Sequence, residues 1–276
     1  MADAAGIDAL TVAAVQMTSG PDPVANMDAA AVLIEQAASD GAQLVVLPEN
    51  FGFMGARDSE RTAHAEADGD GPMQAFLSER AAAAEVWLVG GTLPILAEDG
   101  RANSSCLVYD ADGIRRGRYD KIHLFDVDVP GGDERYRESD RTAPGRTPVM
   151  VDTPWGGLAL AICYDLRFPE LLRQLAGDDL SLIAVPTAFT VPTGRAHWSL
   201  LARTRAVENL CPLVAACQAG THPSGRETWG HSMVIDAWGE VLAELERSPG
   251  VALARLDLRR TRELRAGFPV LSHRML

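Results

Sequence analysis

The chain has 276 residues, 47% hydrophobic and 23% charged, which is ordinary usage for a globular protein and gives no sign of extended disorder. Its formal net charge of -13 and pI near 4.9 predict that it does not bind nucleic acid or anionic lipid, although a basic pocket inside an acidic surface still suits a small anionic substrate. No apolar run approaches the roughly 20 residues of a membrane helix, and the N-terminus lacks signal-peptide features, so we expect a cytoplasmic protein with no membrane partner.

Length and cysteine content point to one folded unit without cross-links. A chain of this size is long enough for one large α/β domain, and we expect residues 1–276 to form it. The four cysteines are Cys106, Cys163, Cys211 and Cys217, and they show no paired metal-ligand spacing. Reduced thiols are therefore predicted, with neither a disulfide framework nor a bound metal.

The first half of the chain alternates apolar strands with helices. A strand, an alanine-rich helix and a second strand form a β-α-β opening that ends at Pro48 and Glu49, and a further helix and strand repeat the cycle. Two more strands flank a turn at 110–113 and predict a hairpin. The expected strands are 10–17, 43–47, 86–90, 104–109 and 114–119, and the expected helices are 27–39 and 73–84.

The second half mixes helices with more hairpins. A glycine- and proline-containing stretch at 127–148 has no clear period, which predicts a long functional loop. Strands alternating with helices early and hairpins later favour a layered α/β sandwich over a purely parallel sheet. The expected strands are 158–162, 182–185, 213–217, 232–236, 241–245 and 251–256, and the expected helices are 168–176, 195–210 and one near Thr261.

Cys163 occupies a position suited to a nucleophile. It directly follows an apolar strand and precedes a helix, where backbone N–H groups and the helix dipole can stabilise a thiolate and later an oxyanion. The alternative is that this cysteine is a small buried apolar residue. None of the six histidines lies in a recognisable thiol-protease signature, so the base must be sought elsewhere.

Glu49 and Lys121 are the candidate partners of Cys163. Glu49 follows a buried strand, where apolar walls would raise its pKa and let it accept a thiol proton. Lys121 follows a strand among apolar neighbours, where a desolvated ammonium could stabilise an oxyanion. Taken singly, Glu49 also fits a solvated glutamate at the rim and Lys121 a surface lysine.

Three motifs in chain order resemble a known family. The segments VVLPENFGF, YDKIHLFDVDVPGG and AICYDLRFPE are similar to the glutamate, lysine and cysteine signatures of the nitrilase superfamily of carbon–nitrogen hydrolases. Further stretches resemble its Nit-type amidase branch, to which deaminated glutathione amidases and omega-amidases belong. These stretches are ESD, AFTVPTGRAHW, ARTRAVEN, WGHSMVIDAWGEV and FPVLSHR, so that the likeness runs from about Val12 to Arg274.

The resemblance implies a role for each matching residue. Cys163 would be the nucleophile, Glu49 the base that activates it and then protonates the leaving amine, and Lys121 the stabiliser of the oxyanion. Glu138 matches a second family glutamate that positions the substrate or the lysine, although it also fits a solvated charge in a charged loop. Tyr164 would contribute only its backbone N–H to the oxyanion. This chemistry needs neither a metal nor an organic cofactor.

Substrate recognition is predicted around Arg167. This arginine could bind a substrate carboxylate bidentately or form a salt bridge with Asp165 or Glu170. Phe189 and Thr190 would line the same mouth. Ser199 stands where the family usually has glutamate, which bears on substrate preference.

The resemblance therefore predicts an amidase that acts on a small amide carrying a carboxylate. The expected substrate is a 2-oxo acid amide, deaminated glutathione or 2-oxoglutaramate, cleaved through a thioester acyl-enzyme with release of ammonia. An aliphatic amidase, a nitrilase or an N-carbamoyl amidohydrolase would share the catalytic residues. A non-catalytic binding or scaffold protein on the same fold is the alternative from another class.

The resemblance also implies an architecture. We expect an α/β fold in which four layers, α-β-β-α, form a sandwich of the nitrilase type. A homodimer or higher homo-oligomer is predicted, with the helices that start at Phe168 and Arg195 in its interface. Otherwise the only expected partner is the small-molecule substrate.

Overall fold

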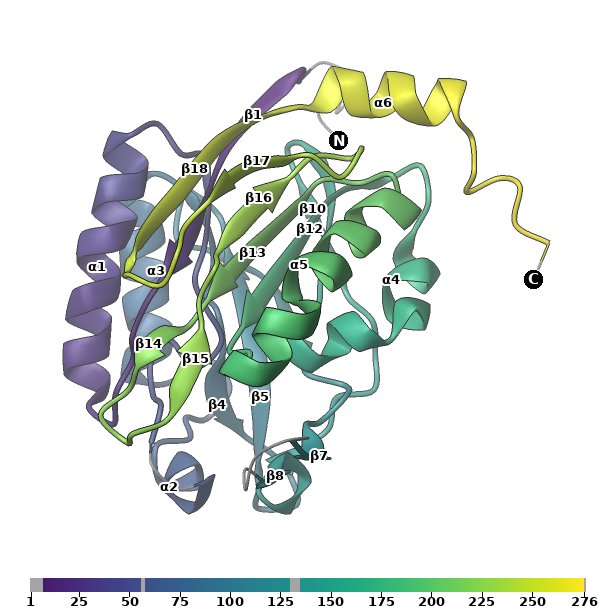
Figure 1. The fold of residues 1–276 in the computed structure, drawn as a ribbon. Coiled ribbons are helices and arrows are strands. Elements are labelled where there is room, and N and C mark those ends of the chain that lie inside the picture. The colour runs from purple at the N-terminus through teal and green to yellow at the C-terminus, as the bar shows by residue number, and fades with distance from the viewer. Residues whose placement is uncertain (1–6, 56–57, 130–134, 276) are drawn as a thin grey trace.

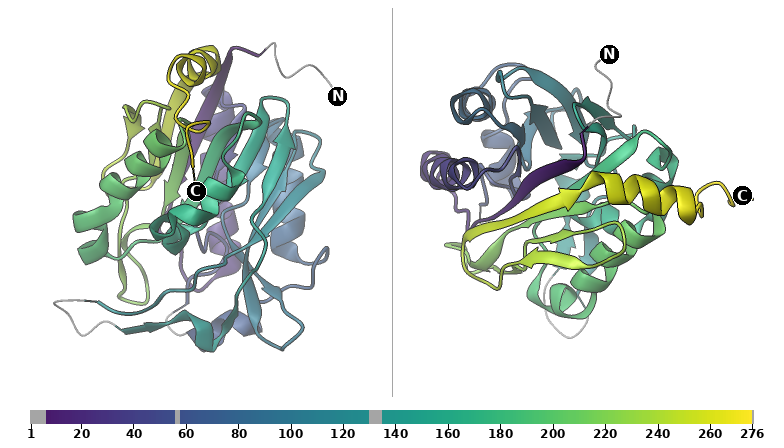
Figure 2. Two further views of the ribbon diagram at one scale, coloured as in Figure 1. Left: turned by 90° about the vertical axis from the view of Figure 1, so that its right-hand side faces the viewer. Right: turned by 90° about the horizontal axis from the view of Figure 1, so that it is seen from above.

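Two β-sheets pack face to face, and helices cover the outer face of each (Figures 1 and 2). The computed structural model describes residues 7–55, 58–129 and 135–275. The order of layers is helix, sheet, sheet, helix, as predicted for an α/β sandwich of the nitrilase type. No helix in these ranges is both long and apolar enough to cross a membrane.

The first sheet has eight strands and joins the two ends of the chain. Its order is β18-β1-β2-β3-β5-β4, and β6 and β9 also pair with β5. The strands β1, β2 and β3 are parallel, whereas β18 runs antiparallel to β1 along the whole of that strand. The bounds are β1 Ala9–Gln16, β2 Leu44–Val46, β3 Trp87–Val89, β4 Leu93–Leu96, β5 Ala102–Tyr109, β6 Arg115–Asp120, β9 Thr142–Ala143 and β18 Gly250–Asp257.

The second sheet has six strands in the order β10-β11-β12-β13-β16-β17, with β11, β12 and β13 parallel. Two short ribbons, β7-β8 and β14-β15, lie outside both sheets. The bounds are β7 Asp126–Asp128, β8 Arg135–Arg137, β10 Met150–Thr153, β11 Gly156–Leu160, β12 Leu180–Thr187, β13 Leu213–Cys217, β14 Ala219–Thr221, β15 Glu227–Trp229, β16 Met233–Ile235 and β17 Val241–Glu244.

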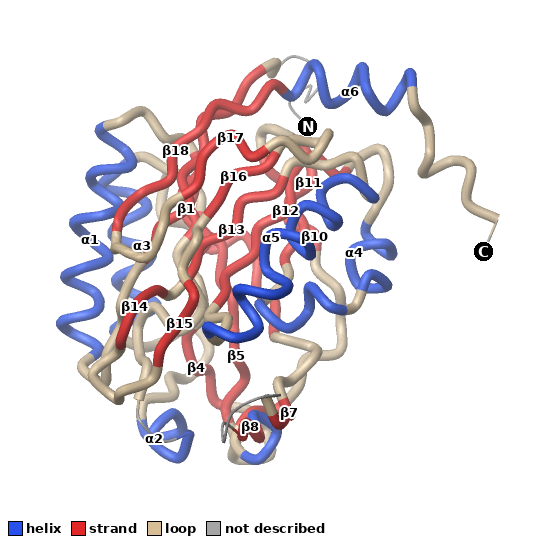
Figure 3. Tube along the Cα trace, viewed as in Figure 1, coloured by secondary structure: helices blue, strands red, loops and turns tan. Residues whose placement is uncertain are grey.

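Prolines start the helices that cover the sheets. The helices α1 (Pro23–Ser39), α3 (Pro72–Ala84) and α4 (Pro169–Leu175) each begin with proline. Proline suits this position because the first backbone N–H groups of a helix have no carbonyl partner within the helix, so the missing N–H costs nothing. Figure 3 shows α5 (Val191–Glu208) lying across the second sheet beside α4. The remaining helical segments are α2 Asp58–Ala63, α6 Leu258–Gly267 and the 3₁₀ turns η2 Glu138–Asp140 and η3 Cys163–Arg167.

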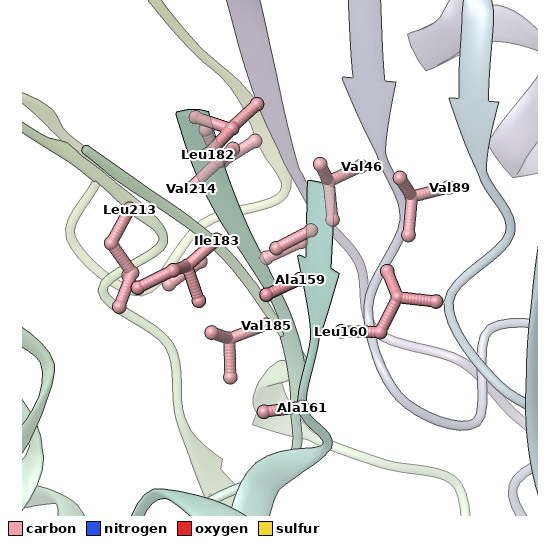
Figure 4. Close-up of a cluster of buried hydrophobic side chains, with 14 of the residues drawn as sticks. Val46, Val89, Ala159, Leu160, Ala161, Leu182, Ile183, Val185, Leu213 and Val214 are labelled. Carbon is pink, nitrogen blue, oxygen red and sulfur yellow. The ribbon is translucent and has the colours of Figure 1, made fainter. Parts of the chain in front are cut away.

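The alternation of side chains along the strands builds two cores. On β1, Val12 and Ala14 face the core between the sheets, whereas Ala13 and Val15 face the core beneath α1 and α3. Figure 4 shows Leu160 of the second sheet close to Val89 of the first. Each central strand is therefore buried on both faces, which explains its continuous apolar sequence.

The structure corrects one predicted segment. Residues 127–148 do not form a simple loop, because their described part contains β8, η2 and β9 as well as the end of β7. The short strands β4 and β10 and the ribbon β14-β15 also lie outside the predicted set. The other predicted strands and helices are present, with ends that shift by up to four residues.

Candidate active site

Three strand ends deliver Glu49, Lys121 and Cys163 to one pocket. Glu49 follows β2 and Lys121 follows β6 in the first sheet, while Cys163 follows β11 in the second. All three line a pocket of about 700 Å³, part of which is open to solvent, and Glu138 lines it too. Residues that are far apart in sequence are thus brought together where the two packed sheets end.

Lys121 is buried between two carboxylates. Its Nζ lies 2.9 Å from Glu49 Oε1 and 2.8 Å from Glu138 Oε2. Glu138 Oε2 also accepts a hydrogen bond of 2.7 Å from the backbone N–H of Phe125. Burial alone would lower the pKa of Lys121, but Glu138 and Glu49 reverse this and raise it. The side chain is therefore a fixed ammonium at the base of the pocket.

Glu49 remains a carboxylate, which corrects the sequence-based prediction of a raised pKa. Burial does act to raise its pKa, but the charge of Lys121 and the hydrogen bond from its ammonium outweigh burial and lower it. The prediction was wrong because the sequence shows the apolar strand before Glu49 but does not show the ammonium beside it. A base is consequently present at neutral pH.

Cys163 is held in a strained backbone conformation as a neutral thiol. Its φ of 46° lies in the left-handed region, which is unfavourable for a residue other than glycine. Only 8% of the residue is exposed. Burial and the negative charge of Glu49 raise its pKa well above the ordinary value, although Lys121 opposes this. These two effects therefore disfavour the thiolate that the backbone N–H groups at this turn can stabilise.

A buried carboxylate, Asp165, ties the Cys163 turn to the segment that carries Lys121. It accepts hydrogen bonds from the Tyr119 hydroxyl at 2.7 Å and from the Ile162 backbone N–H at 2.9 Å. It also contacts the backbone N and Nδ1 of His123, at 3.0 and 2.7 Å. Tyr119 and His123 flank Lys121 in sequence, so Asp165 fixes the ammonium relative to the sulfur.

Arg167 lines the pocket without an acidic partner among the described residues. Its guanidinium carbon lies 5.8 Å from the centre of the Tyr164 ring and 5.7 Å from that of Phe189. Its Nη atoms approach His197 Nδ1 at 3.3 Å. The alternative salt bridges with Asp165 and Glu170 do not form, since Asp165 is already engaged by other donors. A guanidinium held between aromatic rings can receive a carboxylate from a ligand.

Phe189 and Thr190 line the pocket, and the structure adds other residues to its wall. The Tyr164 ring lines it, so the expectation that this residue contributes only its backbone N–H was incomplete. Thr190 also caps α5. The lining residues that the sequence reasoning missed are Asn50, Arg61, Phe125, Tyr136, Thr142, Ala188, Thr193 and Arg226. Within the described ranges, no cluster of His, Cys, Asp and Glu is arranged to hold a metal ion.

The chain is similar to known proteins over most of its length. The family model described as Carbon-nitrogen hydrolase matches residues 11–266. Deaminated glutathione amidase from Yersinia enterocolitica is 39% identical over 264 residues, which are 95% of this chain and 92% of that protein. The human protein of the same name is 40% identical, over 95% of this chain and 81% of its own length.

Solved structures show the same relationship. The crystal structure of Saccharomyces cerevisiae Nit3, described as a member of branch 10 of the nitrilase superfamily, superimposes with a TM-score of 0.88. The two sequences are 32% identical, and the match covers 98% of this chain and 97% of the other.

Proposed function

Because the chain belongs to the carbon–nitrogen hydrolase family and is an amide-hydrolysing enzyme, we propose that it cleaves a 2-oxo acid amide with Cys163, Glu49 and Lys121. The observation that carries this proposal is the buried ammonium of Lys121, bound by two carboxylates beside the thiol of Cys163. Such a group matches what acyl transfer needs, namely a nucleophile, a base and a positive charge for the oxyanion.

Acylation begins with proton transfer inside the pocket. Glu49 takes the proton of the Cys163 thiol as the sulfur attacks the amide carbon, so a free thiolate does not have to form before the attack. Lys121 and the backbone N–H of Tyr164 stabilise the negative oxygen that forms. Glu49 then gives the proton to the leaving nitrogen, the C–N bond breaks, and a thioester remains on Cys163.

Deacylation uses the same base. Water loses a proton to Glu49 as it attacks the thioester carbon, the C–S bond breaks, and the proton returns to the sulfur. Glu138 keeps Lys121 in place through both steps by its contacts of 2.8 and 3.1 Å. Neither a metal nor an organic cofactor is required by this sequence of steps.

Relatives named deaminated glutathione amidase support deaminated glutathione as the substrate. The acyl part of this compound ends in a 2-oxo carboxylate, which Arg167 would bind between the rings of Tyr164 and Phe189. Its leaving group is the dipeptide cysteinylglycine, so the predicted release of ammonia applies to 2-oxoglutaramate instead. A plain aliphatic amide, a nitrile or an N-carbamoyl compound without a carboxylate would leave Arg167 unused.

We also propose that residues 1–276 act as one domain in a cytoplasmic homodimer that binds neither nucleic acid nor membranes. Leu200 and Val207 support the dimer, because both are exposed on α5, at 68% and 44%. Light scattering of the purified protein tests this state, and a monomer at micromolar concentration would contradict it.

The experiment that tests the proposed function compares substrates on the wild-type enzyme and on Cys163→Ala. Release of 2-oxoglutarate is measured from deaminated glutathione and from 2-oxoglutaramate, beside acid release from an aliphatic amide and a nitrile. Turnover of an oxo acid amide that disappears in the alanine variant is the expected result. Turnover of only the aliphatic amide or the nitrile would refute the proposed substrate class, and full activity of the variant would refute the nucleophile.

A further inference from the structure

Arg226 is another guanidinium in the pocket, and it forms no salt bridge with an acidic side chain of the described residues. It lies 5.0 Å from the centre of the Tyr136 ring and lines the pocket together with Cys163. Its Nη2 lies 3.5 Å from the carbonyl oxygen of Ala188, and its buried Nε has no hydrogen-bond partner among the described residues. A buried donor without a partner is costly, so this guanidinium is arranged for a ligand that supplies acceptors.

The hairpin that carries Arg226 is fixed to the rim of the pocket. Arg226 precedes β15, whose Trp229 donates a backbone hydrogen bond of 2.9 Å to Phe189. A β-bridge joins Thr190 to Thr228. Gly194 of α5 also lies so close to Trp229 that an added Cβ would force the Trp229 side chain to shift. The guanidinium is consequently presented from a rigid support.

Arg226 differs from Lys121, the buried ammonium of the site, in its acidic partners. Lys121 is already paired with Glu49 and Glu138. Arg167 and Arg226 each lack a carboxylate partner among the described residues. The pocket therefore offers the guanidinium groups of Arg167 and Arg226 to ligand carboxylates, whereas a third guanidinium in its wall, that of Arg61, donates a hydrogen bond of 2.6 Å to Asn50 Oδ1. Deaminated glutathione has two carboxylates, one on its 2-oxo acyl part and one on its terminal glycine, whereas 2-oxoglutaramate has one.

Arg226 lies close to Ala188 and acts electrostatically on Glu49, the residue that handles the leaving group in the proposed mechanism. In the proposed mechanism Glu49 protonates the leaving nitrogen, and the charge of Arg226 acts on Glu49 and contributes to its lowered pKa. Ala188 links Arg226 to the nucleophile as well, since its carbonyl faces Nη2 and its backbone N–H contacts the sulfur of Cys163. Arg167 instead approaches from the turn after Cys163.

We propose that Arg226 binds the carboxylate of the leaving group and so selects amides whose amine part is a short peptide with a free C-terminus. This inference rests on the proposed function and extends it by assigning the leaving-group half of the substrate. When the C–N bond breaks and Glu49 protonates the nitrogen, Arg226 still binds the carboxylate of the dipeptide. The dipeptide then leaves, and the water needed for deacylation takes its place.

The test compares three substrates on the wild type and on variants of Arg226. Deaminated glutathione, the same compound with its glycine carboxylate converted to an amide, and 2-oxoglutaramate are each given to the wild type and to Arg226→Leu, and 2-oxoglutarate release is followed. Amidation of the substrate and replacement of the arginine remove the same contact. A charge-assisted hydrogen bond of this kind is worth roughly tenfold or more in kcat/KM.

We expect amidation to lower kcat/KM at least about tenfold for the wild type and to change little for Arg226→Leu. The ratio of deaminated glutathione to 2-oxoglutaramate turnover should fall by a similar factor in the variant. Loss of folded enzyme cannot imitate this, because it lowers both rates equally and leaves the ratio unchanged. Arg226→Lys, which keeps the charge, should restore part of the ratio.

Two outcomes would overturn the inference while the proposed function stands. One is an amidation penalty of the same size in wild type and variant, and the other is a wild type that cleaves 2-oxoglutaramate but not deaminated glutathione. If the wild type cleaves neither oxo acid amide, the proposed function itself fails and this inference falls with it.

Discussion

Replacing Glu49 with glutamine should abolish proton transfer by this residue but leave Cys163 able to react as a nucleophile. The variant keeps Lys121 in place, because Glu138 still holds its ammonium at 2.8 and 3.1 Å. Loss of a general base typically costs 10²- to 10⁴-fold, about 2.7–5.4 kcal/mol of barrier. The negative charge of Glu49 is also one of the causes that raise the pKa of Cys163. Removing it leaves Lys121 beside the sulfur and favours the thiolate.

We therefore expect Glu49→Gln to lose turnover while Cys163 reacts with iodoacetamide faster than in the wild type at neutral pH, by at least about tenfold. Alkylation is measured by peptide mass spectrometry, in which Cys106, Cys211 and Cys217 serve as internal controls because all three are buried. Burial raises the pKa of Cys211 and of Cys217 to about 12. If alkylation of Cys163 slows in parallel with turnover, the reasoning about the charge of Glu49 is wrong.

Four further predictions follow from the same contacts. The pKa of Glu49 is lowered and that of Cys163 is raised. We therefore expect kcat/KM to stay level through neutral pH and to fall only below pH 4.5, the ordinary pKa of a glutamate, where Glu49 becomes protonated. A tenfold rise in kcat/KM per pH unit up to about pH 8.5 would instead indicate a free thiol that must ionise before it attacks. Arg167→Leu should raise KM for 2-oxoglutaramate about tenfold or more in steady-state kinetics, and an unchanged KM would remove Arg167 from carboxylate binding. Asp165→Ala should lower the free energy of unfolding by about 2–5 kcal/mol in urea denaturation, since it strands buried donors, and a loss under 1 kcal/mol would contradict its structural role. Gly194→Ala should cost about 1–3 kcal/mol, since the added methyl group meets the Trp229 side chain, and a neutral effect would show that the hairpin is not held there.

Local sequence patterns identified most of the fold because they depend on neighbouring residues. The apolar runs of β1 and β13 and the proline at the start of α4 are visible without tertiary information. The helix α5 starts at Val191, four residues before its predicted start at Arg195, and Gly194 lies in its first turn. In the structure Gly194 is required by its contact with Trp229, which comes from a distant part of the chain.

The electrostatics of the site could not be predicted in the same way. Glu49 and Lys121 are 72 residues apart, and although the resemblance assigns both to one site, no local pattern shows that their side chains form an ion pair. The pKa of Glu49 was therefore predicted in the wrong direction. Arg226 lies in a polar hairpin with no motif of its own, and only the folded structure places its guanidinium beside the ring of Tyr136.

The most direct test of the central proposal is to trap the acyl-enzyme. Wild-type protein is mixed with deaminated glutathione, quenched in acid within the first turnover and digested for peptide mass spectrometry. We predict a 2-oxoglutaryl thioester on Cys163. A portion of the quenched, undigested enzyme that is returned to neutral pH should release 2-oxoglutarate in an amount equal to that of the thioester. Turnover without any adduct on Cys163, or an adduct on another residue, would contradict the assignment of Cys163 as the nucleophile.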